Sequence, residues 1–128
     1  MGYHFTKLVT GSFDEAKARV VQGLKAEGFG VLTEIDVQAT LKARIGADFH
    51  RYTILGACSP RHALQALEAE DKIGTMLPCN VIVQEKGGRI EVSAVDPVAS
   101  MAAIDNPALA GVAREVRDKL KAVVDHLE

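Results

Sequence analysis

Apolar and polar residues alternate near the start of the chain and again around residue 30, a period of two that is typical of strands with one buried face. Residues 3–9 form the first predicted strand, and residues 29–37 form the second. Between them, apolar residues recur every three or four positions, which predicts an amphipathic helix. Ser12 and Glu15 have the spacing of a capping box at its start, and Gly28 suits the left-handed conformation that ends a helix.

The rest of the chain predicts three more strands, a short helix and two longer helices. The segment 52–58 is apolar on both faces, so we expect a central strand. Ser59 and Pro60 are typical of a helix start, and Gly87 with Gly88 is typical of a tight hairpin turn. The predicted elements are a short helix at 39–45, a strand at 52–58, a helix at 60–71, strands at 77–85 and 89–96, and a last helix at 107–126.

This element order, β-α-β-β-α-β-β-α with a short extra helix, predicts a two-layer α+β sandwich. We expect one mainly antiparallel sheet of about five strands, with the helices on one face. No linker, repeat or low-complexity tract interrupts the pattern, so residues 1–128 are expected to form a single α+β domain.

Composition and charge narrow the class of protein. The chain is 48% hydrophobic and 25% charged, as globular proteins are, and its net charge is −2. Clusters of lysine and arginine dominate binding to nucleic acids, and this sequence has none, so we expect no nucleic-acid partner. It also shows no secretory signal and no apolar run of the ~20 residues that span a bilayer. We therefore expect a cytoplasmic protein with no membrane partner.

The chain contains the motifs VLTEIDV at 31–37, LGACSP at 55–60, LPCNVIV at 77–83 and DP at 96–97. These four motifs resemble the successive signatures of the domain of unknown function (DUF) 302 family. The resemblance implies a two-layer α+β domain, and the family includes homodimers. Its members are bacterial and archaeal proteins without an established activity or agreed catalytic residues, and some are encoded near sulfur-metabolism genes. Ser59 stands where the family more often has asparagine, and both residues can cap a helix.

The two cysteines are the most reactive groups in the sequence. Cys58 lies one residue before a helix N-cap, where the helix dipole can lower a thiol pKa, so it is a candidate nucleophile, redox thiol or metal ligand. Cysteine is also one of the most buried residue types, and a core role is the alternative for Cys58 and more so for Cys79. We expect the two residues at opposite edges of the sheet, ~20 Å apart. A disulfide needs Cα atoms within ~7 Å, so two free thiols are predicted.

Polar residues on two strands are further candidates for lining a ligand site. Glu34 and Asp36 are two positions apart and should share a strand face, about 7 Å from each other. Such a pair can do acid–base work, bind a hard cation or simply face solvent. Gly30 is expected on the same face, where it would leave room for a ligand. Asn80 could orient a ligand or pair with buried backbone groups.

Metal and cofactor sites have little support in the sequence. Cys58 and His62 are four residues apart, but a second local pair of ligands is missing, so we predict no metal and no cofactor. No nucleotide fingerprint and no Ser-His-Asp ordering appears. His62 is expected to be solvated.

Two hypotheses about function follow. The first is a non-enzymatic, homodimeric module that binds a ligand or a partner and buries the uncovered sheet face in its dimer. The second is a thiol-dependent redox, sulfur-transfer or metal-binding protein that uses Cys58, with Cys79 in support. We prefer the first.

Overall fold

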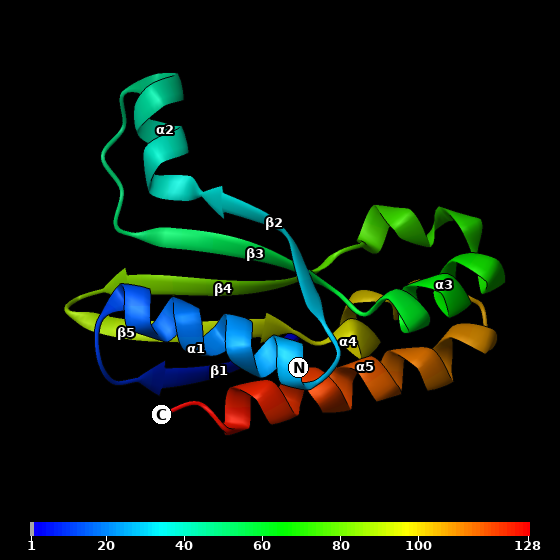
Figure 1. The fold of residues 1–128 in the computed structure, drawn as a ribbon. Helices are drawn as coiled ribbons and strands as arrows, with labels where there is room; N and C mark the ends of the chain where they lie inside the picture. The colour runs from blue at the N-terminus through cyan, green and yellow to red at the C-terminus, as the bar shows by residue number, and fades with distance from the viewer. Residues whose placement is uncertain (1) are drawn as a thin grey trace.

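The computed structural model describes residues 2–128 and contains one five-stranded sheet (Figure 1). The strand order is β1-β5-β4-β3-β2, and every neighbouring pair is antiparallel. The strands are β1 (His4–Val9), β2 (Gly30–Asp36), β3 (Tyr52–Cys58), β4 (Cys79–Lys86) and β5 (Arg89–Val95). The helices are α1 (Phe13–Ala26), α2 (Val37–Ile45), α3 (Pro60–Ala69), α4 (Pro97–Ser100) and α5 (Ala108–Asp125), with a 3-10 segment η1 (Asp71–Met76). The predicted α+β sandwich with one antiparallel sheet is confirmed.

The core lies between the sheet and the two long helices α1 and α5, which run side by side over the same face (Figure 1). Alternate residues of the strands point into this layer, as a period of two requires. The interior strand β3, which lies next to the edge strand β2, contributes Leu55, which is fully buried, and α5 contributes Leu120, which is fully buried as well. Among the helices of residues 2–128, none has both the length and the apolar character of a bilayer-crossing segment.

Local signals at the helix ends act as the sequence indicates. The Ser12 hydroxyl accepts a hydrogen bond from the Glu15 amide at 3.1 Å, and a Glu15 carboxylate oxygen accepts from the Ser12 amide at 3.0 Å. The hydrogen bonds from the Ser12 backbone and side chain lower the pKa of Glu15 below its ordinary value. The extra helix α4 was not predicted. It begins because the Asp96 carboxylate accepts from the Val98 amide at 2.9 Å, with Pro97 in the first turn.

A β-bulge in β2 changes which residues share a face. Val31 pairs with Ala57 and Thr33 pairs with Gly56, so Leu32 is the extra residue. The predicted alternation along 29–37 is therefore wrong beyond Val31. Thr33 and Ile35 face the side away from α1 and α5, which we call the open face. Glu34 and Asp36 lie instead on the helix-covered side, opposite the buried residues of β3, while Gly30 pairs with Cys58 on the open face.

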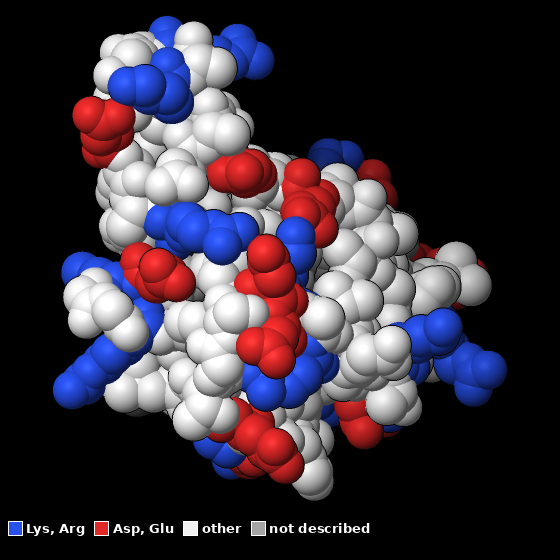
Figure 2. All heavy atoms as spheres, turned by 60° about the vertical axis from the view of Figure 1, so that its left-hand side comes forward, with Lys and Arg blue, Asp and Glu red and all other residues white. Residues whose placement is uncertain are grey.

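Residues 37–51, which we call the arm, project from the edge of the sheet (Figure 1). Helix α2 lies within the arm and has no buried residue. Polar contacts inside the arm hold its shape: the Gln38 side-chain amide donates to the Phe49 carbonyl at 2.9 Å, and Lys42 pairs with Asp48 at 2.9 Å. Figure 2 shows basic and acidic side chains interspersed over one face of the molecule, with basic groups at the top, where the arm lies. The arm thus has polar contacts of its own, but it buries no residue of α2.

Candidate functional site

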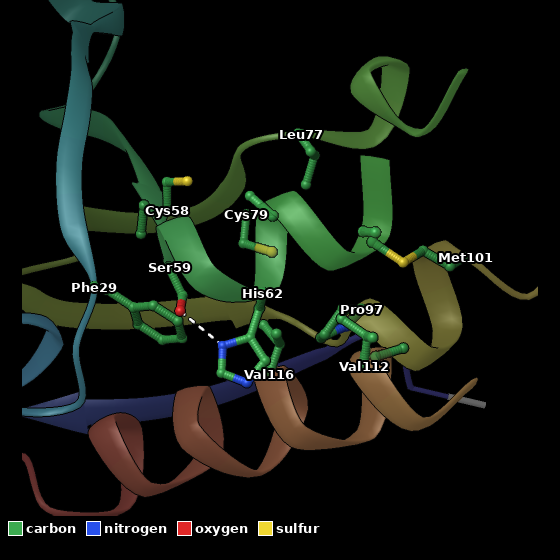
Figure 3. Close-up of a pocket in the computed structure, with 14 residues that line it drawn as sticks. Phe29, Cys58, Ser59, His62, Leu77, Cys79, Pro97, Met101, Val112 and Val116 are labelled. Carbon is green, nitrogen blue, oxygen red and sulfur yellow. Dashed lines mark hydrogen bonds between the residues drawn. The ribbon is translucent and has the colours of Figure 1, made fainter. Parts of the chain in front are cut away.

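The junction between β3 and α3 brings several chemically active side chains together. Cys58 ends β3, Ser59 is the N-cap of α3, and Cys79 begins the neighbouring strand β4. These residues and His62 line a cavity of about 30 Å³, which is otherwise lined mainly by apolar side chains (Figure 3). This volume accommodates about one water molecule, so the cavity is too small for an organic ligand.

The two cysteines lie close together, and the predicted separation of ~20 Å is wrong. Because β3 and β4 are antiparallel neighbours, the end of one strand meets the start of the other, and Ala57 pairs with Cys79. Both cysteines are free thiols in the structure. Successive residues of a strand point to opposite faces, so Cys79 points with Ala57 toward the core and Cys58 points away. Figure 3 shows both cysteines beside the cavity, as separate thiols.

Burial determines how reactive these thiols are. Desolvation raises the pKa of Cys58 above its ordinary value of 9.0. Desolvation, with a smaller contribution from the nearby Cys58, raises the pKa of Cys79 to about 11. Nucleophilic attack and metal ligation need the thiolate, and both residues are protonated at neutral pH. Among residues 2–128, moreover, His, Cys, Asp and Glu side chains form no group of three that could hold a metal ion. The site therefore gives no support to a thiol-based or metal-based function.

A hydrogen-bonded chain of three side chains borders the same cavity. The Ser59 hydroxyl lies 2.7 Å from Nδ1 of His62, and Nε2 of His62 lies 2.9 Å from a carboxylate oxygen of Glu115 on α5. The His62 side chain is only 13% exposed, so the prediction that it is solvated is wrong. The Ser59 hydroxyl makes no bond to the first-turn amides of α3. In the sequence, the one indication of the Ser59–His62 contact was their spacing of three residues at a predicted helix start.

The carboxylates of β2 take part in local structure. Glu34 pairs with Lys17 of α1 at 2.7 Å. The Asp36 carboxylate accepts a hydrogen bond from the Ala39 amide at 2.9 Å and so caps α2. Both lie on the helix-covered side of the edge strand, whereas Asn80 lies on the open face. The five sequence candidates Cys58, Cys79, Asn80, Glu34 and Asp36 therefore do not form one site.

Asn80 instead lines a groove of about 400 Å³ on the open face, which we call the open-face groove. Its lining includes Tyr3 from the N-terminal segment, Tyr52 from β3, Gln84 from β4 and Glu91 from β5. The Gln84 amide nitrogen donates to the Glu91 carboxylate at 3.2 Å. Desolvation first, and then the nearby Tyr3 and Glu91, raise the pKa of Tyr52 above its ordinary value. The groove has the volume and mixed lining of small-molecule sites.

The comparisons with known proteins agree on one family. The model of the family described as "Domain of unknown function DUF302" matches residues 5–127. A crystal structure of an uncharacterized conserved DUF302 protein from Bacillus stearothermophilus is similar to this chain, with a TM-score of 0.93 and 29% sequence identity over 100% of both chains. No curated protein matches. Because the family model covers nearly all of the sequence, the chain belongs to the DUF302 family.

Proposed function

We propose that this protein is a homodimeric binding module in which the arm of each subunit packs on the open face of the other. The observation that carries the proposal is that α2, a helix of nine residues, buries none of them in its own chain. Isolated helices shorter than about 12–15 residues are marginal in water, because most helical stability in proteins comes from packing. A second copy supplies the packing that the chain itself does not.

Apolar side chains of the arm support this arrangement. Phe49 is 40% exposed, and Ile45 at the end of α2 is 74% exposed. Phe49 also stacks on His50, with ring centroids 4.1 Å apart. Exposed apolar groups gathered on one projecting segment are typical of a surface that a partner covers.

The open face offers a matching surface. Ile35, Ile54 and Ile82 lie side by side on three neighbouring strands and form an aliphatic row across the sheet. Ile54 and Ile82 are half-buried. Polar residues such as Asn80 border this row, and an apolar centre with a polar rim is the usual make-up of an interface. In a two-fold dimer, the arm of each subunit packs on the open face of the other. Both contact surfaces of both subunits are then occupied, so no third copy can add to the assembly.

The open-face groove gives this dimer a place for a small ligand. It lies beside the aliphatic row, so a partner arm on the open face would cover its mouth and withdraw a bound molecule from water. Ligand sites occur preferentially where two domains or subunits meet. A ligand bound at such a position would also stabilise the dimer relative to the single chains.

Sedimentation equilibrium at about 10 µM protein tests the dimer. We expect twice the chain mass of 13.7 kDa for the wild type. Ile35→Asp places a carboxylate in the middle of the proposed interface and should give the mass of one chain. The matched control is Leu64→Asp, on α3 and 59% exposed, which should remain dimeric. A wild-type protein with the mass of one chain, or an Ile35→Asp variant with the wild-type mass, contradicts the proposal.

A further inference from the structure

We propose that the open-face groove binds a small organic cation, such as a primary or quaternary amine. The inference rests on the proposed binding function and names the class of ligand. The groove holds about 400 Å³, which is large enough for a molecule of this kind. Three features of its lining favour a positive charge: one carboxylate, two tyrosine rings, and the Asn80 side-chain amide, whose oxygen can accept a hydrogen bond.

The carboxylate is Glu91, whose charge has no basic partner. Among residues 2–128, no lysine or arginine forms an ion pair with Glu91. Its side-chain contact is the neutral amide of Gln84, whose oxygen in turn lies 2.8 Å from Nε2 of His50. This chain from His50 through Gln84 holds the carboxylate in the groove lining without neutralising it. A cation entering the groove would supply the missing charge, whereas an anion would be repelled.

Two aromatic side chains, Tyr3 and Tyr52, line the same groove as the carboxylate. Desolvation first, and then the neighbouring Tyr3 and Glu91, raise the pKa of Tyr52 above its ordinary value. An ammonium group over the face of a tyrosine ring is attracted by the ring quadrupole, and the attraction grows as water is excluded. Rings beside a fixed carboxylate therefore select for a cation over a neutral molecule of the same shape.

The chain carries its own reporter for this site. It contains no tryptophan and two tyrosines, and both tyrosines line the groove. Tyrosine fluorescence therefore reports on the groove alone. We suggest titrating the dimer with choline, which is a quaternary amine, and separately with 3,3-dimethyl-1-butanol, which has the same shape without the charge.

The expected result is a saturable change in tyrosine emission with choline and at least a tenfold weaker response to the neutral alcohol, roughly 1.4 kcal/mol. Glu91→Gln should weaken choline binding by about the same factor. The matched control is Glu85→Gln, which makes the same change in charge on an exposed residue of β4 and should bind as the wild type does. Equal binding of the two ligands, equal binding by Glu91→Gln, or no change in emission up to about 10 mM choline each overturns the inference.

Measuring the mass of the same samples separates this inference from the proposed function. A dimer that does not bind choline overturns the cation site and leaves the dimer standing. A single-chain mass with choline binding intact contradicts the dimer and leaves the cation site standing.

Discussion

Nε2 of His62 on α3 lies 2.9 Å from a carboxylate oxygen of Glu115 on α5, and this contact joins the helix that follows β3 to the last helix of the chain. The other ring nitrogen of His62 contacts Ser59 at the start of α3. The imidazole thus holds the β3–α3 junction against the helix layer. It has a structural role that its position in the sequence did not indicate.

We expect His62→Ala to lower the free energy of unfolding by about 1–2 kcal/mol, because it removes two hydrogen bonds and enlarges the adjoining cavity. Glu115→Ala should cost less than about 1 kcal/mol, because the Glu115 side chain is 65% exposed and solvent screens the pair. Urea unfolding of the two single variants and the double variant measures the coupling between them. If their effects are fully additive, the contact does not contribute to stability.

Both thiols should react slowly at neutral pH. Burial raises the pKa of Cys58 and of Cys79, so the thiolate fraction of each is small until the solution is alkaline. Alkylation by iodoacetamide, followed by mass spectrometry, should show rates that climb above pH 9 and modify Cys58 first. Rapid modification of either cysteine at pH 7 would restore the thiol hypothesis that the structure does not support.

Cys79 should also make stability depend on pH. Its pKa is about 11 in the folded chain, against an ordinary value of 9.0, so the unfolded chain loses this proton first as the pH rises. The folded state therefore keeps its full stability from this group below pH 9 and loses on the order of 2 kcal/mol as the pH passes through 11. Cys79→Ala should flatten the fall in unfolding free energy between these values relative to the wild type. An identical fall in both proteins would show that Cys79 is not buried as described.

Gly56 is required by the close approach of two side chains. A Cβ atom there would overlap Oγ1 of Thr33 and lie 2.7 Å from Cγ of Pro78. Gly56→Ala should lower the free energy of unfolding by about 2–3 kcal/mol, and Thr33→Ala should recover part of the loss. The control is Gly30→Ala, since nothing lies within 4 Å of a Cβ atom at Gly30 and its φ is not in the left-handed region. If Gly56→Ala had the same free energy of unfolding as the wild type, Thr33 and Pro78 would not lie as close to this position as described.

Local sequence patterns predicted the helices and strands. They did not predict the features that depend on pairing between segments far apart in the chain. The capping box at Ser12 and the hairpin glycines were readable because each acts within four residues, and Gly87 and Gly88 do adopt positive φ angles of 60° and 75°. The bulge at Leu32 depends on how β2 pairs with β3, so the faces of Thr33 and Ile35 were predicted the wrong way round.

The candidate site was harder to predict, because its members meet only after the strand order is known. Cys58 and Cys79 come close because β3 and β4 are antiparallel neighbours. Glu115 reaches His62 across 53 residues through the packing of α3 on α5. The open-face groove draws residues from β1, β3, β4 and β5, and Asn80 was the one sequence candidate that lies in it.

The central claim is that a second copy of the chain covers the arm, and amide hydrogen exchange of α2 tests it most directly. We expect the α2 amides of the wild type to be protected, since a partner excludes water from a helix that has no buried residue in its own chain. In Ile35→Asp the same amides should exchange at nearly unprotected rates, while those of β3 keep their protection. Fast exchange of α2 in the wild type, or equal protection in the two proteins, would contradict the account.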